Sequence, residues 1–166
     1  MSTIASTSPA TRNSLLRLSV IGGIIIGLLH LIIENWLVFS LLYKSPFVSV
    51  LQFIASAALG NAAFTGGLTT ALLGVLFHFF TAFVIATVFI FSADRIPFLR
   101  RNLILGSILY GFGAFVVMDF IVLPLSAAPA LPAPTPFQLI ETIIDHILTI
   151  GLPLGILLQR NAKTNS

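Results

Sequence analysis

Long apolar stretches separated by short polar or proline-rich connections dominate the chain. They cover residues 18–42, 68–91, 103–124 and 139–158, and each is bounded by charge, proline or glycine. A helix needs about 20 residues, at about 1.5 Å each, to cross a hydrocarbon core of about 30 Å. The pattern therefore predicts an all-α fold, a polytopic membrane bundle of four transmembrane helices within residues 18–158.

A shorter apolar segment, residues 47–59, lies between the first two stretches. Ser45 and Pro46 precede it as an N-cap and a first-turn proline would, and Gly60-Asn61 and Gly66-Gly67 follow it. Because the segment is too short to cross a bilayer, we expect one short interfacial or re-entrant helix here. An irregular loop outside the membrane is the alternative.

Basic residues cluster at alternate connections, as residues that orient a membrane protein do. Seven occur in the N-terminal flank, the second connection and the C-terminal segment, against Lys44 alone in the other connections: Arg12, Arg17, Arg95, Arg100, Arg101, Arg160 and Lys163. Since cytoplasmic loops carry the excess of Lys and Arg, both termini are predicted to be cytoplasmic. Residues 1–17 are then a disordered cytoplasmic tail, and residues 159–166 are a cytoplasmic C-terminal tail.

Composition agrees with a membrane location and excludes several other classes. Hydrophobic residues make up 57% of the chain and charged residues 8%, against roughly 25% charged residues in soluble domains. Cysteine is absent, which excludes disulfides, Cys-ligated zinc and iron–sulfur clusters. The net charge of +3 comes from orienting residues, not from a face that binds nucleic acid. The expected partners are the lipid bilayer and either another membrane protein or a second copy of the chain.

Small residues recur at helical spacing in every long stretch and predict close helix packing. The positions are Gly23, Gly27, Gly67, Ala71, Gly74, Gly106, Gly111, Gly113, Gly151 and Gly155. Pro153 is expected to kink the last helix. The connection over residues 126–136 has four prolines and no charge, which predicts a stiff, extended cover on the outer face.

Ionisable residues inside the apolar stretches are the candidate site. Because a charge at mid-bilayer costs about 3 kcal/mol or more, such residues usually face the bundle interior and have partners. From the predicted topology, His30 lies about 18 Å from the inner edge, and Asp145 and His146 lie about 9–11 Å from the outer edge. Glu141 lies close to the outer water. The sequence predicts a polar cluster in the outer half of the bundle, made of His30, Glu34, His78, Asp119, Asp145 and His146.

Helical spacing limits which of these side chains meet. His30 and Glu34 share one helix face, and so do Glu141 and Asp145, because each pair is four residues apart. Asp145 and His146 are separated by about 100° around the helix. We therefore expect only one of these two neighbours to join Glu34 and Asp119.

Three roles are open to this cluster. The leading interpretation is a structural or accessory membrane protein whose polar groups fix helix packing. A small transporter, or a proton or ion relay, is the second, since chains of carboxylates and histidines mark such routes. The third is metal binding by His30, Glu34, His78 and Asp119 or His146, or a haem held by His30 and His78.

No cofactor is predicted to be required. Nothing resembles a phosphate loop, a nucleophile elbow or a Ser-His-Asp arrangement, so we do not expect an enzyme.

Several short motifs resemble those of a family of small, uncharacterised bacterial four-helix inner-membrane proteins. They are the run 51–60, Ala63-Phe64-x-Gly66-Gly67, Gly74-x-x-x-His78-Phe79, Leu109-Tyr110-Gly111, the run 118–129, and His146 followed by Gly151-Leu-Pro153. The similarity covers roughly residues 18–160. It implies a location in the bacterial cytoplasmic membrane but no activity. In that family Asn often stands at the position of Asp119, which implies that a charge there is dispensable.

Overall fold

The computed structural model describes residues 12–164, which are almost entirely helical. Helical segments follow one another in the order α1 Arg12–His30, η1 Leu31–Leu42, α2 Phe47–Leu59, η2 Gly60–Thr65, α3 Gly67–Arg95, α4 Pro97–Arg101, α5 Leu103–Val117, η3 Met118–Val122, α6 Leu123–Leu125, α7 Pro136–Asp145, η4 His146–Gly151 and α8 Leu152–Thr164. Segments η1, η3 and η4 are π-helical, and η2 is a 3₁₀ helix.

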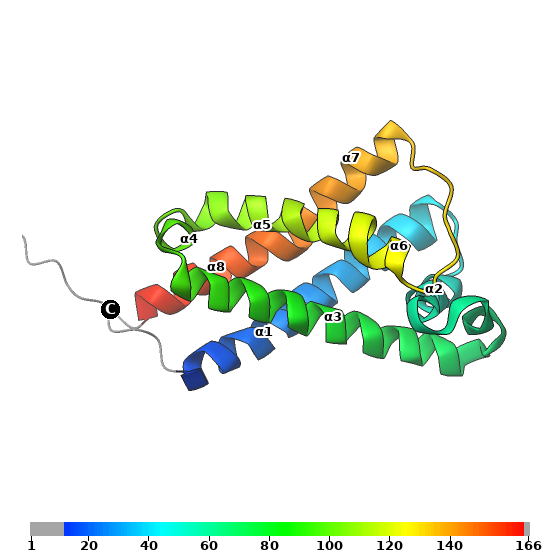
Figure 1. The fold of residues 1–166 in the computed structure, drawn as a ribbon, viewed down its shortest axis with the longest axis horizontal. Coiled ribbons are helices and arrows are strands. Elements are labelled where there is room, and N and C mark those ends of the chain that lie inside the picture. Colours follow the sequence, from blue (N-terminus) through cyan, green and yellow to red (C-terminus); the bar gives the residue numbers. More distant parts are fainter. Residues whose placement is uncertain (1–11, 165–166) are drawn as a thin grey trace, which may run out of the picture.

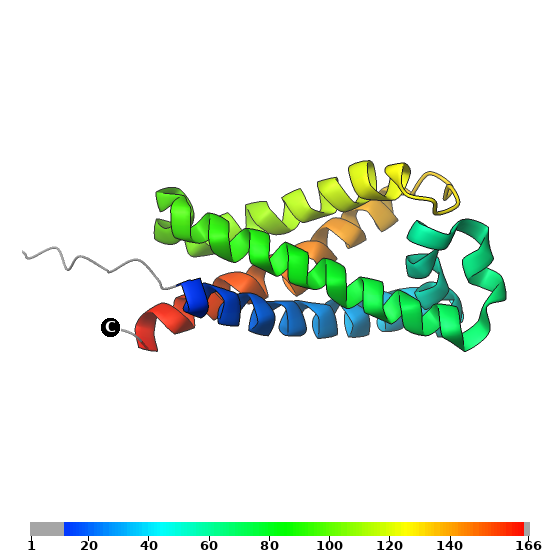
Figure 2. The same cartoon turned by 60° about the horizontal axis from the view of Figure 1, so that its bottom comes forward.

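Four long rods run side by side: α1–η1, α3, α5–η3–α6 and α7–η4–α8 (Figure 1). The start of α1, the short α4 and the end of α8 lie at one end of the bundle (Figures 1 and 2). At the other end are α2, η2 and the connection over residues 126–135. The segments that carry most of the basic residues therefore share one end, which we call the basic end, as the predicted topology requires.

Five helical stretches of the described residues are long and apolar enough to cross a membrane. They are Arg12–Leu42, Phe47–Thr65, Gly67–Arg95, Leu103–Leu125 and Pro136–Ala162. The second joins α2 to η2, so the helix expected over residues 47–59 is present with those bounds, while a count of four spans stays a prediction.

The helical ends differ from the expected tails. Residues 12–17 belong to α1 and not to a disordered tail, and α8 continues through Thr164. Residues 1–11 and 165–166 of the two tails lie outside the described residues.

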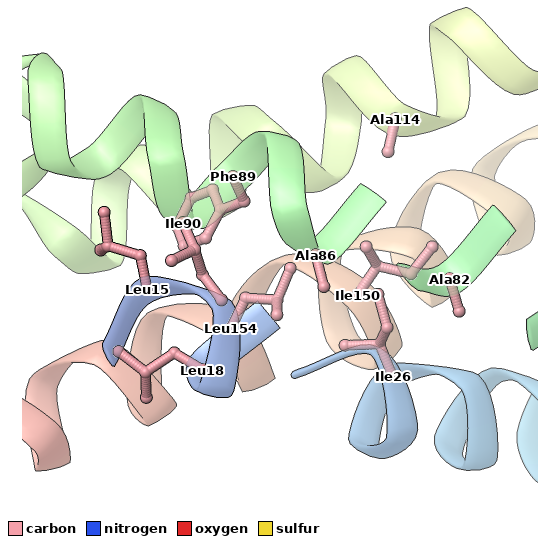
Figure 3. Close-up of a cluster of buried hydrophobic side chains, with 10 residues drawn as sticks. All are labelled: Leu15, Leu18, Ile26, Ala82, Ala86, Phe89, Ile90, Ala114, Ile150 and Leu154. Carbon is pink, nitrogen blue, oxygen red and sulfur yellow. The ribbon is translucent and has the colours of Figure 1, made fainter. Parts of the chain in front are cut away.

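A buried apolar core occupies the half of the bundle nearer the basic end (Figure 3). Its buried members come from α1, α3, α5, η4 and α8: Leu15, Leu18, Ile26, Ala82, Ala86, Phe89, Ile90, Ala114, Ile150 and Leu154. Phe89 and Leu154 are fully buried. These rods hold one another through close side-chain packing.

Glycines allow the closest approaches between rods, largely as predicted. A Cβ at Gly151 would collide with the Ser107 carbonyl oxygen and approach Gly111 at 3.1 Å, and a Cβ at Gly74 would collide with the Leu51 carbonyl oxygen. Gly67 and Gly113 are exceptions, because nothing lies within 4 Å of the position that either Cβ would take. The expectation that these two glycines serve a packing seam is wrong.

The π-helical segments have a partial explanation in the sequence. Segments η3 and η4 end two residues before Pro124 and Pro153, respectively. A helical proline lacks an N–H and its ring clashes with the carbonyl four residues earlier, so the preceding turn widens. The distortion expected at Pro153 thus lies in the turn before it. No proline lies within η1, and we have no physical account of its length.

Candidate functional site

A chamber of about 720 Å³ lies between α3 and the η3–α6 rod, on the side of the bundle away from the basic end. Residues of α2 line it as well, including Phe53 and Ala57. Its size is within the range of about 300–1,000 Å³ that is usual for small-molecule sites. The walls are mostly apolar and aromatic, and the polar lining residues are His30, Asn35, His78, Thr81, Asp119, Ser126 and His146.

Three histidines from three different rods meet at this chamber. The ring of His30 lies parallel to that of His78, with centroids 5.7 Å apart, and at an angle of 70° to that of His146, with centroids 5.2 Å apart. His78 and His146 are buried, with 9% and 6% of their surface exposed. The bundle thus places three imidazoles against one cavity.

His30 is also paired with a buried carboxylate. Its Nδ1 lies 2.8 Å from Oδ2 of Asp145, which is 5% exposed. Thr149 supports the pair, because its hydroxyl donates to Asp145 and lies 3.2 Å from His30 Nδ1. A buried ion pair is stable only when its remaining hydrogen-bonding groups are satisfied, and Thr149 supplies one such bond.

The other two histidines donate to backbone carbonyls. His78 Nε2 donates to the Gly27 carbonyl at 2.9 Å, and His146 Nδ1 donates to the Thr142 carbonyl at 3.0 Å. Carbonyl oxygens only accept hydrogen bonds, so these nitrogens carry the hydrogens. In the neutral rings, Nδ1 of His78 and Nε2 of His146 are therefore acceptors, and neither has a hydrogen-bond partner among the described residues.

Further acceptors near the chamber lack partners. Oδ1 of Asp145 and Oε2 of Glu34 are buried without a hydrogen bond, and Glu34 is only 4% exposed. The Glu34 carboxyl lies within hydrogen-bonding reach of Glu141. Asp119, which is half-buried, lines the chamber and makes no hydrogen bond to the described residues. Leaving a buried acceptor unpaired costs about 1–3 kcal/mol, so these groups require an explanation.

The chamber is closed on the side of the basic end. Ile26, Ala82 and Ile150 line it and also belong to the buried apolar core. Beyond them lies the buried apolar cluster (Figure 3), and the buried hydroxyls of Ser19 and Ser107 lie in the same half of the bundle. Among the described residues, the ionisable cluster therefore has no continuation through the core toward the basic end.

The structure brings most of the predicted site residues together. His30, His78, Asp119 and His146 line the chamber, while Asp145 reaches it through His30 and Glu34 lies beside Glu141. Asp145 and His146 both contact His30. They approach the His30 ring from different sides, which a separation of about 100° allows.

Sequence reasoning missed Thr149, Asn35 and the chamber itself. Thr149 lies four residues after Asp145, and that spacing was the only available signal. Asn35 is buried and donates to the His30 carbonyl five residues earlier, a contact that the π-helical turn permits.

The described residues contain no group of three or more His, Cys, Asp or Glu side chains arranged to hold a metal ion. Metal and haem binding therefore stay predictions without geometric support. Comparisons with family models, curated proteins and solved structures found no match, so the family resemblance also stays a prediction and the site is interpreted from its own geometry.

Proposed function

We propose that the protein binds a lipophilic organic cation or amine in the chamber, with the apolar body against its walls and the charged head at the histidines and Asp119. The observation that carries this proposal is a mostly apolar cavity of about 720 Å³ lined by Asp119 and by His78 and His146, each of which keeps one ring nitrogen without a hydrogen-bond partner among the described residues. Among the described residues, no Lys or Arg lines the cavity. Acceptors without donors favour a cationic or hydrogen-bond-donating ligand.

The aromatic side chains in the chamber wall also favour an organic cation. Phe53, Phe77 and Phe80 line the chamber. Aromatic rings attract organic cations through their negative faces, by about 0.5–2 kcal/mol for each contact. A cation with an apolar body reaches such a site from the hydrocarbon phase. Phe80 is 65% exposed and Ile121 is 48% exposed in the isolated chain, which supports a lateral entrance beside them.

In this proposal the protein has four spans in a bacterial cytoplasmic membrane, with both termini in the cytoplasm. Helix α2 does not cross the membrane but re-enters it to cover the chamber. Two observations support this placement. Gly60 has a positive φ of 57°, which ends α2 in a turn, and Ala127 N of the proline-rich connection donates to the Ala57 carbonyl at 3.0 Å.

A pair of probes of matched shape and opposite charge tests the function. Tetraphenylphosphonium should bind the purified protein in detergent at least about tenfold more tightly than tetraphenylborate, measured by equilibrium dialysis, because the ionisable groups that line the chamber are the Asp119 carboxyl and three imidazoles. Ala57→Phe should fill the chamber and weaken phosphonium binding by at least about tenfold. Ala62→Phe on the exposed η2 turn is the matched control and should bind normally. Equal binding of both probes, or an unaffected Ala57→Phe protein, would overturn the proposal.

A packing role is supported for one member of the cluster. The bond from His78 to the Gly27 carbonyl joins α3 to α1 inside the bundle. His78→Asn should lower the melting temperature of the protein in detergent by a few degrees, because membrane hydrogen bonds contribute about 0.6–2 kcal/mol each. An unchanged melting temperature would remove the packing role.

A further inference from the structure

We infer that the His30–Asp145 pair exchanges a proton for the cation that occupies the chamber, and that this proton leaves on the side of Glu141. The inference rests on the proposed function and adds proton coupling to it.

The pair lies between two cavities. His30 lines the chamber, whereas Asp145, Glu141 and Thr149 are the polar residues of a second cavity of about 300 Å³, which is bordered by η1, α7 and η4 and otherwise lined by apolar side chains. The 2.8 Å contact from His30 to Asp145 therefore joins the two cavities. Histidine and carboxylate chains of this kind carry protons in membrane proteins.

His30 is the histidine that holds the exchangeable proton. It alone of the three pairs with a carboxylate, while His78 and His146 donate to backbone carbonyls. The titratable groups that face the His30–Asp145 pair come from every packed element: His78 of α3, Asp119 of η3, Glu141 of α7, His146 of η4 and Glu34 of η1. Together with Asp145 itself, three further carboxyl groups, those of Asp119, Glu34 and Glu141, thus lie around His30.

A cation in the chamber would disfavour a proton on His30. Its positive charge would lie about 5 Å from the His30 ring, and at an effective dielectric constant of about 20 the repulsion favours the neutral ring by about a hundredfold. The N–H bond at His30 Nδ1 breaks and an O–H bond forms at Asp145 Oδ2. That proton then passes to the water at Glu141, so one positive charge enters as another leaves.

On the opposite side, the apolar side chains of Ile26, Ala82 and Ile150 lie between the histidines and the basic end. The proposal therefore places proton exchange on the side of the second cavity.

Calorimetry in two buffers of different ionisation enthalpy separates binding from proton release. Tetraphenylphosphonium has no titratable group, so every released proton comes from the protein. We expect about one proton released for each cation bound, and an affinity that rises about tenfold for each unit of pH, because proton and cation compete. Binding without proton release, at an affinity independent of pH, would overturn this inference and leave the proposed function intact. An absence of binding heat and of dialysis binding would overturn both.

Asp145→Asn keeps the shape of the pair and removes its charge. The variant should bind the cation but release fewer than about 0.2 protons, because His30 loses its partner carboxylate. Asp94→Asn, the same change near the basic end of α3, should release the normal number. Full proton release by the Asp145→Asn protein would show that another group supplies the proton.

The exit route has its own test. Glu141→Gln should leave the number of released protons unchanged but slow their appearance at a pH-indicator dye, by at least about tenfold in a stopped-flow experiment. An unchanged rate would overturn the route through Glu141.

Discussion

The two halves of the bundle are built from the same rods, yet one half has a filled apolar interior and the other encloses a chamber. Near the basic end the rods are α-helical and meet in a buried apolar core around Phe89 and Leu154. In the other half they carry the π-helical segments, a large chamber and buried acceptors without partners. π-helical turns and buried polar groups without hydrogen bonds both cost free energy. In proteins, such features are found most often at functional sites. The comparison indicates that the core stabilises the fold, and it supports the proposal that the chamber half binds a ligand.

The largest expected effect is on the free energy of unfolding, and it is tested by truncating one phenylalanine in each half. Phe89→Ala should destabilise the protein by about 3–5 kcal/mol, because it empties a fully buried site. Phe80→Ala at the chamber should cost less than about 1 kcal/mol but weaken phosphonium binding several-fold. Thermal unfolding in detergent and dialysis give both values. Equal destabilisation would remove the distinction between the halves.

Substitution of two glycines, one at a close contact between rods and one without a neighbour, tests how much rod packing contributes to stability. Gly151→Ala should destabilise by about 1–3 kcal/mol, since its Cβ meets backbone atoms of the α5 rod that have no room to move. Gly113→Ala, which meets nothing within 4 Å, should be neutral or slightly stabilising. If both variants melted at the same temperature, the close contact between the rods would not matter for stability.

The His30–Asp145 pair should contribute to cation binding and not to the stability of the fold. His30→Leu alone should cost about 1–3 kcal/mol, because it leaves the buried Asp145 carboxylate short of a donor. Combining it with Asp145→Leu should restore the wild-type melting temperature or exceed it, as replacement of buried ion pairs often does. A double variant less stable than either single variant would assign the pair to the fold.

The smallest effect concerns a polar contact in the core half. The Tyr110 hydroxyl donates to the Ile85 carbonyl at 2.7 Å. Tyr110→Phe should cost about 0.5–1.5 kcal/mol and leave cation binding unchanged. A loss of binding would mean that this hydrogen bond shapes the chamber.

The fold was largely predictable because hydropathy and helix length are strong signals in a membrane. Helix α2 has the expected bounds, and the basic segments share one end. The grouping of His30 with Asp145 was also within reach. Their estimated depths, about 18 Å from one edge and about 9 Å from the other, place them at similar levels of a core of about 30 Å.

The chamber was not predictable, because it depends on how far η3 and α3 stand apart and on turns wider than an α-helix. Helical spacing assumes about 3.6 residues per turn, and η1 and η4 depart from it on both sides of the site. Gly113 shows the same limit, since glycine spacing alone does not say which face meets a neighbour.

Crystals grown with tetraphenylarsonium test the central claim most directly, because arsenic scatters anomalously and the ion has the shape and charge of the phosphonium probe. We expect an anomalous peak inside the chamber, bordered by His78, Asp119 and Phe80, and its loss in the Ala57→Phe protein. A peak only outside the chamber, or none at a concentration that saturates binding, would contradict the account.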